Sequence, residues 1–504
     1  MLPVFEYTKG RMMMKPIVLC ILDGVGINSK RVHNAVALAN MPFYDNLLKK
    51  YPNSKLKASG HAVGLPHDVM GNSEAGHLTI GSGRVINQFI RNFELLDFKT
   101  NEPINNFIKS VKDDGGIVHV LGLMSDGRVH SDVNDIIKIM KYVVKQGLRI
   151  CIHFIADGRD TPPQSAQKYI KLIRKKLSRD FRHDMVFFGT LSGRYYTMDR
   201  NKNMDRTELA FDAIAKGKSK YHAETINDAL ADAYARGETD EFIKPIVINP
   251  TKLTKKDGLL FCNYRGDRAR QILREIVKTK CHILCFSQYG EGLNEICPAI
   301  IEDKQIENTL GDVLAENGIS QLRIAETEKY NHVTYFFDAG RNIDYKKEEK
   351  VLVPSPNVET FDMKPEMSAN EITDELLKRL SKFDVVILNF ANGDMVGHTG
   401  NESAAIKAME CLDEQLSRIV PTVLKLKGAV LIIADHGNAE QMYNKKRKVP
   451  LTSHTLNPVR FIMVSNKKYV AHKGELKDVA PTILHLLNIE KPKEMDGESL
   501  VKEQ

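Results

Sequence analysis

The sequence predicts an α/β protein of two domains, with parallel sheets flanked by helices. The chain has 504 residues, which is too long for one simple core. Its composition, 42% hydrophobic and 27% charged, is typical of a globular protein. Short apolar runs alternate with segments of helical period along almost the whole chain, and this alternation is typical of sheets whose strands are joined by helices.

The predicted strands are short apolar runs rich in β-branched residues. They are Ile17–Leu22, Ile117–Leu123, Arg149–Ala156, Met185–Phe188, Leu259–Asn263, His282–Phe286, Val385–Asn389 and Val430–Ala434. Helices are predicted between them. The segment "DVNDIIKIMKYVVK" places Val133, Ile136, Ile137, Met140 and Val144 on one stripe. The segment "SANEITDELLKRL" predicts a helix that opens with a capping box of Ser368 and Glu371.

Composition narrows the cellular setting and the partners. Seven cysteines lie mostly in apolar runs and form no C-x-x-C pair, so we expect reduced, buried thiols in a cytoplasmic protein. The run "PIVLCILDG" is too short to span a membrane, and residues 1–15, expected to be a tail, lack the layout of a signal peptide. The net charge of +8 weakly favours anionic partners, either nucleic acid or small phosphorylated molecules.

Acids and histidines follow the apolar runs near both ends of the chain. A single Asp or His at such a place is usually a cap, a turn former or a surface residue. Six at the ends of strands instead favour a divalent metal site: Asp23, Asp394, His398, Asp435, His436 and His454. Mixed oxygen and imidazole ligands suit Mn²⁺, Zn²⁺ or Co²⁺. Because six ligands exceed what one catalytic ion takes, we expect two ions.

Ser73, in "VMGNSEAGHLTIGSGR", has two interpretations. A serine among glycines is usually an ordinary turn or cap residue. Next to a metal, however, its hydroxyl would become an alkoxide nucleophile without a histidine base. On this interpretation Gly71 and Gly76 leave the clearance that attack requires.

Basic residues follow the apolar runs in the middle of the chain. Any one arginine is more often a solvated surface residue. Several at successive strand ends favour a pocket for a small polyanion, since guanidinium groups bind carboxylates and phosphates bidentately. The set is His130, Arg159, Arg194, Arg200, Arg265, Arg268 and Lys329. Asp160, the acid within it, is a candidate to exchange a proton with a substrate hydroxyl.

This distribution also predicts the domain organisation. The first and last thirds share one chemistry and the middle has another, which indicates a domain with a second domain inserted into it. We expect a tail at 1–15, a first domain formed by 16–87 and 304–504, and an inserted domain at 88–303.

The motifs resemble a known family. "ILDGVG", "MGNSEAGHLTIGSGR", "SDGRVHS", "ADGRDTPP", "SGRYYTMDR", "RGDRARQ", "AETEKYNHVTYFF", "NFANGDMVGHTG", "ADHGNAE" and "SHTLNPV" occur in this order from about Pro16 onward. Together they closely resemble the cofactor-independent (2,3-bisphosphoglycerate-independent) phosphoglycerate mutases of the alkaline phosphatase superfamily.

The resemblance implies an alkaline-phosphatase-like three-layer α/β domain interrupted by an α/β transferase domain. It implies an isomerase that interconverts 3-phosphoglycerate and 2-phosphoglycerate in glycolysis and gluconeogenesis, as a cytoplasmic monomer without nucleic-acid or membrane partners. Two Mn²⁺ ions would be bound, with Co²⁺ or Zn²⁺ as possible substitutes. One ion would be held by Asp23, Ser73, Asp435 and His436, and the other by Asp394, His398 and His454.

The resemblance also implies roles in catalysis. Ser73 would take the phosphoryl group from the substrate and return it to the other hydroxyl of the retained glycerate. The basic set and Asp160 would bind substrate, with Asp160 as acid and base and Lys329 reaching the transferring phosphoryl group.

Three alternatives remain open at this point. One is another phosphotransferase or phosphatase of the superfamily, although a plain phosphatase would not need the arginine pocket and a sulfatase would need a C/S-x-P-x-R motif. Another is a nucleic-acid-binding protein, which would need a basic stripe with interleaved aromatic residues. The third is a catalytically inactive homologue, although every expected ligand position is filled.

Overall fold

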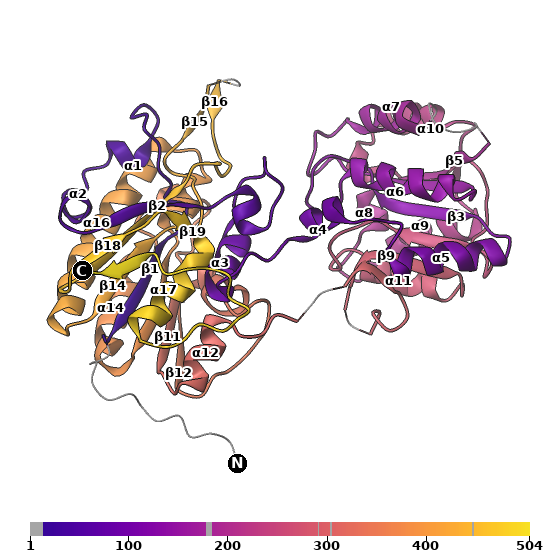
Figure 1. The fold of residues 1–504 in the computed structure, drawn as a ribbon. Coiled ribbons are helices and arrows are strands. Elements are labelled where there is room, and N and C mark those ends of the chain that lie inside the picture. The colour runs from indigo at the N-terminus through magenta and orange to yellow at the C-terminus, as the bar shows by residue number, and fades with distance from the viewer. Residues whose placement is uncertain (1–13, 178–183, 291, 303–304, 446–447) are drawn as a thin grey trace, which may run out of the picture. The chain divides into compact units, whose positions relative to one another are not determined.

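The computed structural model describes residues 14–177, 184–290, 292–302, 305–445 and 448–504. Most of the predicted tail, residues 1–13, lies outside these ranges. The chain divides into two compact units (Figure 1): unit 1 comprises residues 1–91 and 305–504, and unit 2 comprises residues 92–304. Unit 2 is therefore inserted between the two segments of unit 1. The predicted α/β class, with one domain interrupted by another, is confirmed.

Unit 1 contains an eight-stranded sheet. In spatial order its strands are β12 (Glu348–Val353), β11 (Gln321–Glu326), β13 (Val385–Phe390), β1 (Ile17–Leu22), β14 (Ala429–Ile433), β17 (Val459–Ser465), β2 (Asn53–Lys57) and β19 (Gly474–Glu475). The pairings from β12 to β14 are parallel, whereas β17 runs antiparallel to both of its neighbours. Strands β1, β13 and β14 are buried along their whole length.

Helices pack on this sheet and on one another. They are α1 (Ala35–Leu38), α2 (Pro42–Lys50), α3 (Ser73–Ser82), α12 (Leu310–Glu316), α13 (Thr327–Asn331), α14 (Ala369–Arg379), α15 (Asn392–Gly397), α16 (Glu402–Lys425) and α17 (Val479–Leu486). Helix α16 contacts β1, β14 and the helices α1, α2, α14 and α15, while α3 packs with α12 and α17. Two small ribbons pair β15 (Tyr443–Asn444) with β16 (Val449–Pro450) and β18 (Tyr469–Ala471) with β20 (Val501–Glu503).

Unit 2 contains a second eight-stranded sheet. In spatial order its strands are β10 (Ala299–Ile301), β9 (His282–Ser287), β8 (Gly258–Phe261), β3 (Val118–Leu123), β4 (Ile150–Ala156), β5 (Val186–Gly193), β7 (Ile246–Val247) and β6 (Tyr221–His222). Every pairing is parallel except that of β5 with β7.

The helices of unit 2 contact the sheet and one another. They are α5 (Glu102–Asp113), α6 (Val133–Lys145), α7 (Ala166–Leu177), α8 (Arg194–Thr197), α9 (Met204–Lys216), α10 (Ile226–Ala235) and α11 (Arg270–Val277). Helix α4 (Phe89–Leu95) lies where the chain passes from unit 1 to unit 2. The predicted apolar stripe of α6 is buried, as expected.

All eight predicted strands are present, but two other expectations need correction. The sheets are not wholly parallel, because each contains an antiparallel pairing, such as β14 with β17 and β5 with β7. The predicted capping box at the start of α14 is wrong. Ser368 is the N-cap residue, yet its hydroxyl donates to the carbonyl of Pro354 at 2.7 Å and makes no capping hydrogen bond.

Candidate metal centre and anion pocket

The acids and histidines of unit 1 converge at one edge of its sheet. Asp23 follows β1, Asp394 lies in α15 just after β13, and Asp435 follows β14 by two residues. These three strands are adjacent and parallel, so their carboxyl ends meet at the same edge. The carboxylates of Asp23, Asp394 and Asp435 are all buried.

Ser73 lies at the start of α3, with its hydroxyl among these groups. Asn72 is the N-cap, and its side chain accepts from the backbone N–H of Ala75. Ser73 Oγ is 2.6 Å from Lys329 Nζ, 3.0 Å from His436 Nε2 and 3.2 Å from Asp23 Oδ1. The hydroxyl therefore faces a cation, an imidazole and a carboxylate at the positive end of a helix dipole.

Lys329 lies in this cluster rather than with the arginines. Sequence reasoning from strand ends grouped it with the basic set of the middle of the chain, but α13 belongs to unit 1. Its ammonium group is 3.0 Å from Asp23 Oδ1 and 2.7 Å from Asp394 Oδ2, and its side chain is 3% exposed. Lys329 thus bridges two of the three carboxylates and the serine hydroxyl.

His398 and His454 form a second group around Asp394. His454 Nε2 is 3.0 Å from Asp394 Oδ1, His398 Nε2 is 3.2 Å from the same oxygen, and the two Nε2 atoms are 3.0 Å apart. The Nδ1 atom of each ring lies within hydrogen-bond distance of a backbone carbonyl, Thr452 O for His398 and Gly71 O for His454. Such bonds orient the rings and leave both Nε2 atoms facing the carboxylate.

The charges in the cluster shift one another's pKa values. Burial alone would raise the pKa of Asp23, but Lys329 and His436 outweigh it and hold that pKa well below the usual range. Asp394 is held low in the same way. Burial disfavours the charged form of His436, yet Asp435, Asp23 and Asp394 raise its pKa to about 9. His436 and His77 lower the pKa of Asp435 against the effect of burial, so all three acids are ionised and outnumber the positive charges of Lys329 and His436.

The donor set fits divalent cations. Three groups could each hold an ion: Asp394 with His398 and His454, Asp23 with His77 and Asp435, and Asp23 with Asp394 and His436. Within each group the ligand atoms lie within 4.8 Å of one another. Asp435 Oδ2 is buried, and its polar neighbours are two imidazoles, His77 Nδ1 at 3.2 Å and His436 Nε2 at 3.6 Å. Carboxylate oxygens and imidazoles gathered in a buried site are suited to a cation, because buried charges are stabilised by pairing or by metal coordination.

Two further residues of the cluster were missed from the sequence. His77 is fully buried, with Nδ1 2.9 Å from Ser73 O and 3.2 Å from Asp435 Oδ2. Asn389 donates to Asp23 Oδ2 at 2.8 Å and lies 3.0 Å from His77 Nε2. The signals were present, since His77 follows Ser73 by one helical turn and Asn389 is a polar residue inside a buried strand.

The glycines around Ser73 serve close packing rather than clearance for attack. A Cβ on Gly71 would lie 2.0 Å from the carbonyl oxygen of Ala58. A Cβ on Gly76 would lie 2.8 Å from the carbonyl oxygen of Asp435. Both glycines therefore let α3 and the loop before it approach neighbouring backbone, and this corrects the sequence interpretation.

The arginine set of unit 2 lies at the carboxyl ends of adjacent strands. His130 follows β3, Arg159 and Asp160 follow β4, Arg194 begins α8 directly after β5, and Arg265 and Arg268 follow β8. These four strands are neighbours in the order β8, β3, β4, β5 and run parallel, so the residues meet at one edge. Arg200 follows α8.

Ion pairs, of which those of Arg194 are buried, orient the residues of this basic cluster. Arg194, 2% exposed, donates from Nη1 to Asp157 at 2.8 Å and to Asp160 at 2.5 Å. Arg200 donates to Asp267 at 2.9 Å, and Arg265 Nε lies 3.7 Å from the same carboxylate. Two acids that sequence reasoning did not single out, Asp157 and Asp267, therefore fix the arginines.

The pocket is electropositive. Burial and the positive charge of Arg194 lower the pKa of His130 to about 4, so this imidazole is neutral at neutral pH. Its Nδ1 atom is buried and has no hydrogen bond among the described residues. Burial and the neighbouring Arg194, Arg200 and Arg159 lower the pKa of Arg268. The pocket is thus suited to an anion that would offset this repulsion. Arg159 is exposed, and its Nη1 atom lies 3.5 Å from Glu241 Oε1.

The state of the cysteines and the character of the helices bear on the expected cellular compartment. All seven cysteines are free thiols, and six of them are buried. Among the described residues, no helix combines the length and the apolar character needed to cross a bilayer, and the 24-residue α16 is no exception.

Comparisons with known proteins give the family. The metalloenzyme superfamily profile matches residues 15–491. The 2,3-bisphosphoglycerate-independent phosphoglycerate mutase 1 of Methanosarcina acetivorans is 44% identical over 512 aligned positions, covering 97% of this chain and 98% of the relative. The corresponding mutase of Clostridium botulinum is 43% identical, covering 97% of this chain and 100% of the relative.

A solved structure agrees with these relatives. The Leishmania mexicana phosphoglycerate mutase, crystallised at low cobalt concentration, superposes with a TM-score of 0.72 at 29% identity, covering 99% of each chain. The two relatives and the solved structure each align with nearly the whole chain. The chain belongs to the metalloenzyme superfamily and, within it, to the 2,3-bisphosphoglycerate-independent phosphoglycerate mutases.

Proposed function

We propose that this protein is an isomerase that interconverts 3-phosphoglycerate and 2-phosphoglycerate through a phosphoserine at Ser73, without 2,3-bisphosphoglycerate. The observation that carries the proposal is the setting of one hydroxyl. Ser73 Oγ starts a helix within hydrogen-bond distance of Lys329, His436 and Asp23, in a chain that belongs to the mutase family.

We propose that two divalent ions serve this site, Mn²⁺ by preference, with Co²⁺ or Zn²⁺ as substitutes. One would be held by Asp23, Ser73, Asp435 and His436, and the other by Asp394, His398 and His454. Bound there, such ions lower the pKa of a hydroxyl group and stabilise negative charge on a phosphoryl group. Support comes from the three buried carboxylates, which the positive charges of Lys329 and His436 do not fully balance.

The residues around Ser73 have separate tasks. Lys329 donates to Oγ and offers positive charge to the phosphoryl group. The first turn of α3 adds backbone N–H groups and the positive end of its dipole. As the bond between Ser73 Oγ and phosphorus forms, the bond between phosphorus and the substrate oxygen breaks, and the reverse transfer goes to the other hydroxyl of the same glycerate.

The pocket of unit 2 would hold the glycerate during this exchange. We propose that His130, Arg159, Arg194, Arg200, Arg265 and Arg268 bind the carboxylate and phosphate of the substrate. Asp160, whose Oδ2 already accepts from Arg194, would exchange protons with the substrate hydroxyls. Retaining the acceptor at high effective concentration explains why transfer back to glycerate would outcompete hydrolysis.

The remaining parts of the proposal concern organisation and setting. We propose a metal-binding domain of residues 16–87 and 304–504 and an inserted substrate-binding domain of residues 88–303. We also propose a cytoplasmic monomer without nucleic-acid or membrane partners. The unpaired thiols of all seven cysteines support a reducing compartment.

Product analysis tests the proposed function. The protein is supplied with 3-phosphoglycerate and Mn²⁺, free of bisphosphoglycerate, and both 2-phosphoglycerate and inorganic phosphate are measured. We expect 2-phosphoglycerate from the wild type, and its loss with a chelator or in Ser73→Ala. Release of phosphate alone would identify a phosphatase, and undiminished mutase activity in Ser73→Ala would contradict the proposal.

A further inference from the structure

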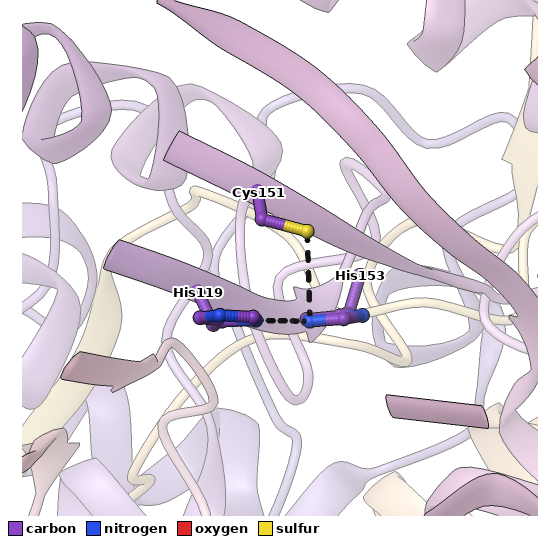
Figure 2. Close-up of side chains that lie close together, drawn as sticks. All are labelled: His119, Cys151 and His153. Carbon is purple, nitrogen blue, oxygen red and sulfur yellow. Dashed lines mark hydrogen bonds between the residues drawn. The ribbon is translucent and has the colours of Figure 1, made fainter. Parts of the chain in front are cut away.

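Unit 2 contains a cluster of potential metal ligands away from the arginine pocket: His119, Cys151 and His153. His119 lies on β3, and Cys151 and His153 lie on the adjacent strand β4 (Figure 2). In the sheet His119 is paired with Cys151, and Leu121 with His153, so all three side chains project from the same face. The cluster lies near the amino ends of these strands, whereas the arginines follow their carboxyl ends.

The three side chains are in contact and shielded from water. Their exposed fractions are 0%, 0% and 1%. His119 Nδ1 is 2.8 Å from His153 Nε2, and Cys151 Sγ is 3.9 Å from the same nitrogen (Figure 2). The two rings are nearly parallel, at 11°. His153 Nδ1 lies 3.0 Å from the hydroxyl of Thr190 on β5, which fixes the orientation of that ring.

One nitrogen of this cluster has no partner. His119 Nε2 is buried and makes no hydrogen bond among the described residues. Only one proton can lie between His119 Nδ1 and His153 Nε2, so one of these facing nitrogens carries a lone pair. For both to bind an ion, that proton moves to the other nitrogen of its ring, as the tautomers of a neutral imidazole allow. Burial lowers the pKa of His119 to about 4 and also lowers that of His153, so both rings are neutral and able to act as ligands.

We propose that His119, Cys151 and His153 bind a thiophilic transition-metal ion, Zn²⁺ or Cu⁺, at a site separate from the proposed di-metal centre. A thiolate with two imidazoles is a donor set that selects soft or borderline ions, whereas Mn²⁺ prefers oxygen. The acids and histidines around Ser73 include no cysteine, so the two sites differ in chemistry.

The two contacts made by His153 need only small adjustments to accept an ion, and the ligand atoms of all three residues lie within 4.8 Å of one another. Bonds of about 2.05 Å to nitrogen and 2.3 Å to sulfur, at tetrahedral angles, place two nitrogens about 3.3 Å apart and sulfur about 3.6 Å from nitrogen. The nitrogen pair must therefore open by about 0.5 Å from 2.8 Å, and sulfur must close by about 0.3 Å from 3.9 Å. Rotation about side-chain torsions supplies shifts of this size.

Binding must also displace a proton. Burial raises the pKa of Cys151 to about 12, and the nearby Thr251 hydroxyl offsets this only in part, so the free thiol is protonated at neutral pH. Metal binding forms the bond between the ion and sulfur and releases the thiol proton to solvent. With Cu⁺ the thiolate complex is neutral overall, and with Zn²⁺ it carries one positive charge. The low polarity of the site thus favours the monovalent ion.

Sulfur ligation can be tested on the full, reduced chain without using activity. The wild type, Cys151→Ser and Cys262→Ser are titrated with Co²⁺ as a spectroscopic substitute for Zn²⁺, and charge-transfer absorption from thiolate to cobalt is recorded. Cys262 is an equally buried cysteine of unit 2 outside the cluster, so it is the matched control. We expect the band in the wild type and in Cys262→Ser, and its loss in Cys151→Ser.

X-ray absorption on the wild type keeps the test valid if Cys151→Ser fails to fold. Protein loaded with Zn²⁺, and separately with Cu⁺ under anaerobic reducing conditions, is examined for a sulfur neighbour at about 2.3 Å. A sulfur neighbour found with either ion supports the proposal and identifies that ion as the metal that the site binds. Absence of sulfur ligation with both ions, and of the cobalt band, would overturn it and leave the cluster as a hydrogen-bonded packing arrangement.

Discussion

Replacing Lys329 by methionine isolates the balance of charge at the proposed metal centre. Methionine keeps most of the length and apolar volume of the side chain but removes the ammonium group. That group lies 3.0 Å from Asp23 and 2.7 Å from Asp394, and it is 3% exposed, so solvent does not screen the pairs. Without a divalent cation, Lys329→Met takes from Asp23 and Asp394 the one lysine that pairs with both, and leaves them only their neutral and imidazole partners. Breaking a buried pair in this way costs about 3–5 kcal/mol of unfolding free energy.

Divalent ions should reverse part of this loss. Lys329 repels a cation bound beside the same carboxylates, so the variant is expected to bind divalent ions more tightly than the wild type. Each tenfold gain in affinity narrows the stability deficit by about 1.4 kcal/mol when the sites are saturated. Mutase activity should nevertheless fall by roughly 10²–10³-fold, since a donor to Ser73 Oγ has been lost.

The assay must report on unit 1 alone. The chain has no tryptophan, so fluorescence of that residue is no probe, and hydrogen exchange in the buried strands β1 and β13 is suitable instead. Exchange is measured with chelator and with Mn²⁺. The control is Lys350→Met, which removes a lysine paired with Asp344 at 2.8 Å and Glu348 at 3.3 Å in the same unit, outside the cluster.

The two lysine variants should differ in one respect. The stability lost in Lys329→Met should depend on Mn²⁺, and that lost in Lys350→Met should not. If Lys329→Met loses the same stability with chelator and with Mn²⁺, the charge reasoning for this centre is refuted.

Three further predictions follow from single contacts. Gly71→Ala should destabilise unit 1 by more than about 1 kcal/mol, because the new Cβ would lie 2.0 Å from Ala58 O; an unchanged melting temperature would contradict this. Burial raises the pKa of Asp135 to about 6, so protonation of this carboxyl stabilises the folded state. This contribution to the unfolding free energy is complete below about pH 4 and is lost as pH rises through 6, and it amounts to at most about 3 kcal/mol. In Asp135→Asn the unfolding free energy should lack this slope, and a retained slope would point to another group. Arg194→Lys keeps the positive charge but loses the planar guanidinium group that donates to Asp160. We expect kcat/KM to fall by roughly 10–100-fold, and an unchanged kcat/KM would exclude a positioning role for Arg194.

The sequence was sufficient to predict the parallel core of each sheet. Strands such as β1 and β13 are uninterrupted apolar runs because both of their faces are buried. The convergence of Asp23, Asp394 and Asp435 could also be predicted, because carboxyl ends of adjacent parallel strands share an edge.

Other features depend on contacts between distant segments, which local patterns do not record. Strand β11 was missed because Arg323 interrupts its apolar pattern, although that arginine is fully buried and paired with Asp338 at 3.2 Å. Lys329 lies in the helix that directly follows this strand, and without β11 it could not be placed at the same sheet edge as Asp23 and Asp394. Neighbouring residues in the sequence could not show that Ser368 lacks a capping hydrogen bond, because its hydroxyl donates instead to the carbonyl of Pro354, 14 residues away.

Trapping the phosphorylated enzyme tests the central claim most directly. Protein with Mn²⁺ is mixed with 3-phosphoglycerate labelled in its phosphate and quenched in acid within one turnover, and the label is mapped to a peptide. The account predicts label on Ser73 that appears and decays at the rate of the overall reaction, and none in Ser73→Ala. Label on another residue, or turnover with no labelled protein at any time, would contradict it.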